Sequence, residues 1–441
     1  MIQTVRNAWK IPELRNKMLF VIFALLIFRL GSAIPVPFIN GDALQGQLAA
    51  ASGTIFGLIN VMSGDAFAQA TVFALSIQPY INSSIIIQLL TVAIPALERL
   101  AKEGGEEGRK KIASITRYAT VAIALIQAFG YYTLIKSYGL ITVPEGYGVW
   151  GAIVIIASFT AGSAFLMWLG EQITEFGIGN GISIILFAGI VSRGPALVLT
   201  LWNGAKAALG KPVAPGYTAI PVWAIPLIII GILAIVVLIV FVSDAERRIP
   251  VQYAKRVVGR KMYGGQSTHI PLKVNMSGVM PIIFAQSIAS LPATIGMFAG
   301  WTKDSEGFGG GLMRVFDSTG LFYCIIYFLL IVGFSYFYST IQFNPIEVAN
   351  NLKKNGGFVP GFRPGKPTAD FITKVLGKIT MFGALYLAII AIAPIVVTAL
   401  LGAGNLAIGG TSVIIVVGVA LETVKQLEAQ MLMRHYKGFL E

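Results

Sequence analysis

The side chains that most often perform catalysis or bind metals are scarce in this chain. It has two histidines, His269 and His435, and one cysteine, Cys324. Neither histidine has neighbours at the spacing of a zinc site, and one cysteine cannot form an intramolecular disulfide. The sequence therefore predicts no metal site and an ordinary packing role for Cys324.

Phosphate-binding and acid–base motifs are equally weak. Gly210–Lys211 is the closest approach to a phosphate-binding loop, but Pro212 follows where that motif needs Ser or Thr. The acidic residues nearest to apolar segments lie at segment ends, at Glu171, Glu175 and Glu422. We therefore expect no enzyme, no catalytic residue and no cofactor. Energy for any transport would have to come from a partner ATPase, from translation or from the proton-motive force.

Apolar sequence is what the chain has in quantity. Hydrophobic residues make up 56% of it and charged residues 12%, about half the charged share of soluble domains. About ten runs approach the roughly 20 residues that a helix needs to cross a bilayer. These runs are 18–36, 70–95, 115–136, 150–170, 179–200, 220–242, 274–294, 319–340, 377–401 and 406–424. The predicted fold class is an all-α integral membrane protein. The first run lacks a convincing cleavage site and is expected to remain as a span.

Positive charge alternates along the chain. Most of the 33 Lys and Arg lie in every second loop, in the stretches 6–17, 99–117, 247–273, 353–378 and 425–437. Because membrane insertion leaves Lys and Arg on the cytoplasmic side, both termini are predicted to be cytoplasmic. The net charge of +13 follows mostly from this topology. Anionic lipid and an acidic or RNA-bearing cytoplasmic partner both remain open.

The number of runs permits an internal repeat. About ten spans would divide into two sets of five, and an odd number per set would give the sets opposite orientations, as in many transporters. Residues 1–200 and 220–424 show no convincing self-similarity, so the repeat is a hypothesis from span count alone. Prolines interrupt some of the runs, at Pro79, Pro281 and Pro394, where they would free backbone carbonyls at membrane depth.

Three segments between the runs are unusual. Gly53–Ala70 is apolar but too short to cross, and Gly64 breaks it, so an interfacial helix and a re-entrant segment both remain open. Ser243–Lys273 alternates apolar and polar residues, which predicts a short hairpin held off the membrane. Gln342–Lys378 predicts a short helix over Ile346–Lys354 after a start at Asn344. The two long loops are either a docking surface or a simple topology signal.

Several long motifs resemble those of the bacterial SecY family, the channel subunit of the Sec protein translocase. They are SIQPYINSSIIIQLLTVAIPALERLAKEGGEEGRKK, GIGNGISIILFAGIV, QSTHIPLKVNMSGVMPIIFAQSI, GGFVPGFRPGKPT and IGGTSVIIVVG. The resemblance runs from Asn16 to the C-terminal tail. It implies a protein-conducting channel with about ten transmembrane helices in two five-helix halves that form an inverted repeat around a central pore. The halves would be residues 1–200 (spans 1–5) and 201–441 (spans 6–10), with cytoplasmic loops at about 243–273 and 342–378.

The resemblance also implies a plug and a pore ring. The plug would be a short helix at about 57–68, including Gly57, Leu58, Ile59, Asn60, Val61, Met62, Ser63 and Gly64. The ring would consist of Ile81, Ile85, Ile182, Leu186, Ile283 and Ile415. Ile81 and Ile85 are four residues apart, as are Ile182 and Leu186, so each pair shares one helix face. Branched aliphatic side chains close a narrow hole without binding ions and yield to a passing chain.

A side exit and docking surfaces complete what the resemblance implies. Polar residues that would bridge a lateral gate are Ser84, Gln127, Asn275 and Gln286, with static packing of the helices as the alternative. Such a bond contributes about 0.6–2 kcal/mol. The loops would bind the SecA ATPase or the ribosome through Arg256, Arg260, Lys261 and Arg363.

The implied partners and location follow from the same resemblance. SecE and SecG subunits, signal peptides, unfolded preproteins and membrane lipid are the expected partners, and the bacterial plasma (inner) membrane is the expected location. The expected function is translocation of unfolded secretory proteins and sideways release of transmembrane segments into lipid. A charge such as Arg29 within the first run is costly, and the sequence leaves its role open.

A secondary transporter of small solutes is the rival interpretation. Such a transporter usually needs polar or charged residues near the bilayer midplane. The predicted midplane residues of spans two, five, seven and ten are Ile, Leu and Val, which favours a seal over a binding site.

Overall fold

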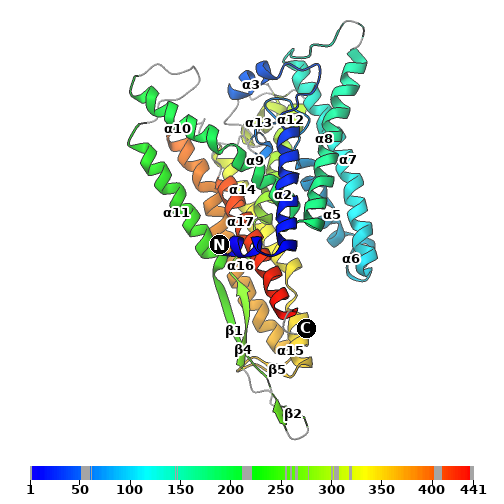
Figure 1. The fold of residues 1–441 in the computed structure, drawn as a ribbon, viewed down its shortest axis with the longest axis vertical. Coiled ribbons are helices and arrows are strands. Elements are labelled where there is room, and N and C mark those ends of the chain that lie inside the picture. The colour runs from blue at the N-terminus through cyan, green and yellow to red at the C-terminus, as the bar shows by residue number, and fades with distance from the viewer. Residues whose placement is uncertain are drawn as a thin grey trace.

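The structure is a computed structural model. It describes residues 2–50, 60, 62–144, 146, 148–210, 221–253, 256–258, 261–263, 267–276, 278–298, 301, 307–316, 320–401 and 410–437. Long helices form a bundle, and a small unit with strands projects from one end of it (Figure 1). The bundle helices are α2 (Pro12–Gly31), α5 (Gln78–Ala93), α7 (Gly105–Ser137), α8 (Gly148–Phe176), α9 (Gly181–Ser192), α11 (Ala224–Asp244), α12 (Met280–Phe298), α14 (Leu321–Gln342), α16 (Lys366–Leu401) and α17 (Gly410–Lys437). Shorter helices are α1 (Ile2–Trp9), α3 (Gly41–Ala50), α6 (Pro95–Lys102), α10 (Gly194–Ala208), α13 (Phe308–Val315) and α15 (Pro345–Lys354).

Each predicted apolar run overlaps one of the bundle helices. Six helices are long and apolar enough to cross a membrane among the described residues, or seven if α5 and α6, bent by 105° at Ile94, count as one span. These lengths and compositions are those of a multi-pass membrane protein. The helix α2 has the length of a span but contains Glu13, Arg15, Lys17 and Arg29. The full set of about ten spans therefore stays a prediction.

Two of the prolines start helices where we expected them to interrupt spans. The second run was expected over 70–95, yet α5 begins only at Gln78, and Pro79 lies in its first turn. Pro281 is likewise the second residue of α12. Proline is favoured at these positions because the first turn of a helix has no acceptor for the missing N–H. Residues 71–77 form turns that lead into α5.

Three apolar clusters hold the bundle together. One lies entirely within residues 36–159, around Tyr131, Ile155 and Phe159, and another within residues 235–417, around Tyr327 and Ile331. The third joins the two regions and is described below with the site. The clusters agree with a division into two halves, while the boundary near residue 200 and the repeat stay predictions.

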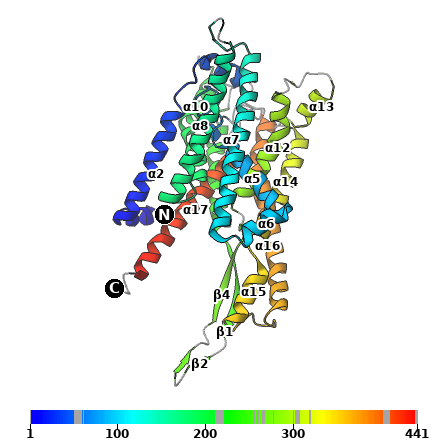
Figure 2. The ribbon, with the colours of Figure 1, turned by 90° about the vertical axis from the view of Figure 1, so that its right-hand side faces the viewer.

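The two long loops fold together into one small unit. Strand β1 (Glu246–Tyr253) pairs antiparallel with β4 (Ser267–Lys273), and β5 (Gly357–Phe358) from the second loop pairs on the other edge of β1. A separate hairpin of β2 (Arg256–Val258) and β3 (Lys261–Tyr263) extends beyond this sheet (Figure 2). The predicted hairpin is confirmed, as is the short helix, since Asn344 caps α15 by accepting from the backbone N–H of Ile346 and Glu347.

This unit has its own apolar core, which allows a stability prediction. Leu272 and Val251 are fully buried in it, next to Leu352 and Ile372. Replacing Leu272 by Ala should destabilise the unit by about 2–5 kcal/mol, because it leaves a cavity. We expect faster protease cleavage of the unit in membrane vesicles. The exposed Ile346 of α15, replaced by Ala, is the control, and equal cleavage of both variants would contradict the assignment of this core.

The first helix, α1, and the end of the last helix, α17, lie toward the end of the bundle that bears the strands (Figure 2). Helix α1 packs on α17, where Thr4 Oγ1 donates to Glu428 Oε1 at 3.0 Å. Ala8, Leu14 and Leu427 are buried in the same contact. Placing both ends on one side of a membrane agrees with the alternation of basic loops, and the assignment of that side to the cytoplasm stays a prediction.

Candidate functional site

Residues from four helices meet in one apolar cluster near the middle of the bundle. The six positions predicted for a ring all belong to it, and we call them the isoleucine cluster: Ile81 and Ile85 of α5, Ile182 and Leu186 of α9, Ile283 of α12 and Ile415 of α17. Five of them are buried, each at most 5% exposed, and Ile182 packs half-buried at the edge. The structure thus brings together side chains from distant parts of the sequence, since Ile81 and Ile415 are more than three hundred residues apart.

A cavity with a mixed lining, called here the polar cavity for its ten polar side chains, opens on one side of the isoleucine cluster. It has a volume of about 460 Å³. Its polar lining comprises Tyr80, Ser84, Gln88, Arg117, Glu171, Thr174, Glu175, Asn180, Ser183 and Tyr338. Its apolar part includes Ile81, Ile182, Leu186 and Ile283, so the cluster closes one end of the cavity. Arg117 and Glu171 form an ion pair at 2.9 Å in its wall.

A second cavity lies beside the first and shares part of its lining. It measures about 540 Å³ and also borders Ile283 and Tyr338. It extends along α17 as far as Ala429, and Lys425 in its lining forms an ion pair with Asp244 of α11 at 2.6 Å. The second cavity therefore lies toward the strand-bearing end of the bundle, because α17 runs to that end (Figure 1), and the first cavity adjoins it.

The opposite side of the isoleucine cluster is covered by a folded-back segment whose described residues are 60 and 62–68, called segment 60–68 below. Along α9, Asn180 lines the polar cavity, Ile182 and Leu186 belong to the cluster, and Gly189 contacts the segment. Since a helix rises about 1.5 Å per residue, these are successive levels along the bundle. Helix α12 repeats the order, with Met280 at the cavity and with Gln286 Nε2 donating to Met62 Sδ at 3.7 Å.

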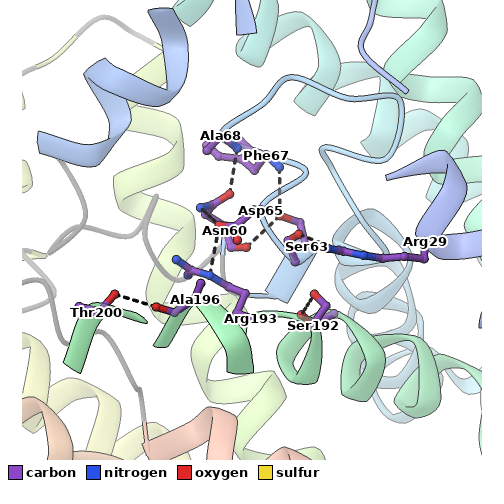
Figure 3. A network of polar contacts seen from close by, with 12 residues as sticks. Arg29, Asn60, Ser63, Asp65, Phe67, Ala68, Ser192, Arg193, Ala196 and Thr200 are labelled. Atoms are coloured by element: carbon purple, nitrogen blue, oxygen red, sulfur yellow. Dashed lines mark hydrogen bonds and ion pairs between the residues drawn. The ribbon is translucent and has the colours of Figure 1, made fainter. Parts of the chain in front are cut away.

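Segment 60–68 is organised by its own polar side chains (Figure 3). Asn60 Nδ2 donates to Asp65 Oδ1 at 2.8 Å, and Asn60 Oδ1 accepts from the backbone N–H of Ala68 at 2.9 Å. Ser63 Oγ accepts from the N–H of Phe67 at 3.1 Å. The described part is helical only up to Ser63, and residues 64–70 are turns, so the expected helix over 57–68 does not continue to its end. Residues 57–59 and Val61 of the predicted plug lie outside the described residues.

Two glycines let the backbone of this segment touch the backbone of α9. A Cβ on Gly189 would lie 2.4 Å from the Met62 carbonyl oxygen, and a Cβ on Gly64 would lie 2.6 Å from Ser192 Oγ. Gly64 also has a φ of +66°, which disfavours any other residue. The close approach explains why small residues are needed on both sides of the contact.

The four predicted gate residues are not brought together. Ser84 lines the polar cavity, Gln286 faces Met62, Asn275 lines the second cavity, and Gln127 is half-buried on α7. Within the described residues no hydrogen bond joins any two of them, and Asn275 Oδ1 and Gln286 Oε1 are buried without a partner. Helix α12 does contact both α5 and α7. A seam between these helices therefore exists without a polar bridge between these residues.

The predicted docking arginines occupy two places on the strand-bearing unit. Arg363 is exposed in a turn between Gly361 and Gly365, whose φ angles are +87° and +102°. Its carbonyl accepts from Thr368 Oγ1 at 2.8 Å, and the adjacent Phe362 stacks on Phe371 at 4.2 Å between ring centroids. These contacts hold the turn in one conformation.

The remaining docking residues belong to the hairpin at the tip. Arg256 begins β2 and Lys261 begins β3, beyond the sheet of β1, β4 and β5 (Figure 2). Arg260 lies outside the part of the chain that the structure describes.

The arginines that touch segment 60–68 were missed as site residues. Arg29 of α2 and Arg193, between α9 and α10, both contact it. The charge of Arg29 within an apolar run was the available signal, but the sequence does not show what it pairs with.

Comparison with known proteins places this arrangement in a family. The SecY family model matches residues 71–424. The protein translocase subunit SecY of Streptomyces scabiei is 45% identical over 454 residues, and that of Bacillus subtilis strain 168 is 43% identical over 448, each covering 100% of both chains.

Solved structures share the fold at lower identity. One of a protein-conducting channel superposes with a TM-score of 0.64 at 18% identity, covering 95% of this chain and 93% of the other. Sec61 in a canine ribosome–channel complex gives 0.60 at 16% identity, covering 95% and 93%. The full-length identity to curated relatives confirms the resemblance seen in the motifs, and the protein belongs to the SecY family.

Proposed function

We propose that this protein is a protein-conducting channel that translocates unfolded secretory proteins across the bacterial plasma membrane. The observation that supports it most is the order of three levels along the bundle: a polar cavity, the isoleucine cluster and segment 60–68. A polar cavity can receive a hydrated chain, an apolar constriction can seal around it, and a segment beyond the constriction can act as a plug. The family membership supports the same function.

The chemistry of the cluster suits a seal that does not recognise its cargo. Branched aliphatic side chains offer no ligand to an ion and exclude water from a narrow opening. They also yield to side chains of different size, because they make no directional bonds. A small-solute transporter would instead need polar groups at this level, whereas the six positions of the isoleucine cluster are all aliphatic.

Sideways release into lipid would occur at the seam of α12 with α5 and α7. The buried oxygens of Gln286 and Asn275 have no hydrogen-bond partner among the described residues. Since unpaired buried polar groups are costly, these two side chains do not stabilise the closed seam. An inserting signal peptide would therefore displace mainly apolar contacts when it separates α12 from α5.

The strand-bearing unit is the proposed docking surface for SecA and the ribosome, and would face the cytoplasm with both termini. Arg363 is exposed on a turn held by Gly361, Gly365 and the Phe362–Phe371 stack. A preordered guanidinium can bind a carboxylate or an RNA phosphate in a bidentate way. SecE and SecG subunits are expected partners within the membrane, on the basis of family membership.

The experiment that tests the channel is site-specific photocrosslinking to a stalled precursor. A photoreactive residue at Ile283 should crosslink to a secretory precursor arrested during SecA-driven translocation, because the chain must pass the isoleucine cluster. The same residue at Leu329 of α14, which is 62% exposed on the outside of the bundle, is the control. Capture at Leu329 but not at Ile283 would reject the proposed path.

A polar substitution within the cluster should loosen the closed state. Ile283→Asn places an amide in an apolar constriction, which admits water and weakens the seal. The loss of apolar burial should destabilise the closed state by about 1–3 kcal/mol. We expect export of precursors with defective signal peptides to rise roughly five- to 150-fold, as such an energy predicts. Ile283→Leu, which keeps the seal apolar, is the control. Unchanged signal stringency in Ile283→Asn would remove this residue from the constriction.

A further inference from the structure

Two arginines hold the segment that covers the isoleucine cluster, and both come from the N-terminal half. Resting on the channel function proposed above, we propose that Arg29 and Arg193 latch segment 60–68 to the N-terminal half, so that the plug stays seated when the halves first separate and leaves only in a second step. We call the Arg29–Gly64 and Arg193–Asp65 contacts the plug latch.

The plug latch holds two consecutive residues, Gly64 and Asp65. The arginines that contact them come from two places in the chain, α2 and the junction of α9 and α10 (Figure 3). Arg193 Nε lies 3.1 Å from Asp65 Oδ1, and Arg29 Nη1 donates to the Gly64 carbonyl oxygen at 3.3 Å. Asp65 is itself fixed by Asn60, so the pair acts on the folded segment and not on one loose side chain. The Gly64 carbonyl also gives Arg29 the polar partner that a charge in an apolar helix requires.

The remaining anchors come from the N-terminal half as well. Tyr131 of α7 donates its hydroxyl to the Phe67 carbonyl. The backbones of Gly64 and Gly189 are in direct contact. The hydrogen bond that crosses to the C-terminal half is Gln286 Nε2 to Met62 Sδ at 3.7 Å, and a thioether is a weak acceptor. Moving α12 away would therefore break no strong hydrogen bond of the segment, although it would uncover part of the apolar packing around Met62.

Backbone strain gives the second step a driving force. The non-glycine residues with positive φ in the described chain are Phe38, Asp65, Ala70 and Ser76, of which Asp65 lies in the segment and Ala70 lies two residues after it. Left-handed conformations are unfavourable for such residues and persist only where other contacts enforce them. The contacts of Asp65 with Asn60 and Arg193 hold it in this conformation, so breaking the plug latch would let this residue relax.

The charged contact is accessible to solvent. The side chains of Arg193 and Asp65 are 30% and 31% exposed. Ion pairs of this exposure are screened by salt. The frequency of spontaneous plug release should therefore rise with ionic strength in the wild-type channel and should not do so once the pair is removed.

The first test measures resting ion conductance of the channel complex in planar bilayers. Arg193→Asp and Asp65→Arg should each raise it several-fold, and the double variant should return it toward the wild-type value because the pair is restored with reversed polarity. Lys206→Asp on α10, whose side chain lies over the ring of Trp202, is the control. Conductance equal to wild type in both single variants, or no recovery in the double variant, would overturn the latch.

The second test follows the two steps separately by crosslinking. In a Cys324→Ser background, which removes the chain's single cysteine, one pair is Ser63→Cys with Ser192→Cys and the other is Met62→Cys with Gln286→Cys. The first pair leaves the plug latch intact, and Ser192 lies beside Gly64, the residue next to Ser63. Adding Ile283→Asn should abolish bismaleimide crosslinking of the second pair and retain the first. Loss of both pairs together would show that the plug does not stay with the N-terminal half. Failure of the photocrosslinking at Ile283 would instead reject the channel function itself, so the two failures are distinguishable.

Discussion

Deleting residues 57–68 is expected to leave a protein that inserts into the membrane but leaks ions at rest. The described part of this stretch covers the isoleucine cluster, with Met62 buried in the same apolar packing and Gly64 against Gly189. If the protein is the proposed channel, only the isoleucine cluster would then separate the two aqueous sides. A loss of about 1.4 kcal/mol in preference for the sealed state raises the open fraction roughly tenfold.

Single-channel recording of the purified complex measures this change. Gly333→Ala is a suitable control, because a Cβ at that position of α14 meets open space. A deletion variant with normal abundance and wild-type resting conductance would show that segment 60–68 does not contribute to the seal.

Charge reversal at Arg363 is expected to have the other large effect. Arg363→Glu should impair SecA-driven export while leaving insertion of the protein itself intact. Truncating or reversing one partner of a desolvated charge pair costs about 2–5 kcal/mol, so a fall of at least 30-fold in initial export rate is expected. The cause would be loss of docking, since Arg363 is exposed and its turn is held by the backbone and by the Phe362–Phe371 stack.

A matched variant separates docking from general charge effects. Lys353→Glu on α15 changes the net charge of the strand-bearing unit by the same amount as Arg363→Glu. Lys353 is also exposed. This variant should retain most of the export rate, and Arg363→Lys should be intermediate because an ammonium cannot bind in a bidentate way. Normal export by Arg363→Glu would mean that the loop serves only as a topology signal.

The helices and their approximate positions could be predicted from the sequence. Their apolar runs are long, and local rules fix several ends: Asn180 and Asn344 accept hydrogen bonds from the first backbone N–H groups of α9 and α15. The hairpin of β1 and β4 was also predictable, because it is local and alternates in polarity. Its pairing with β5 was not, since β1 and β5 are separated by about a hundred residues and no local pattern specifies a two-residue strand.

The site was predictable only with help from the family resemblance. Each isoleucine of the cluster looks like ordinary helix packing on its own, and only the fold shows that α5, α9, α12 and α17 aim these residues at one place. Arg29 illustrates what remained hidden. Its charge marked it as unusual, but its partner is a backbone carbonyl, which every residue has, so no sequence pattern could identify Gly64 as the contact.

The central claim is that this protein conducts unfolded polypeptides. The most direct measurement is transport of an unfolded secretory precursor into liposomes that contain the protein with SecE, supplied with SecA and ATP. Protease-protected precursor that depends on both SecA and ATP is the predicted result. No protected precursor, in liposomes where the protein is shown to be correctly inserted, would contradict the channel and direct attention to small solutes as cargo.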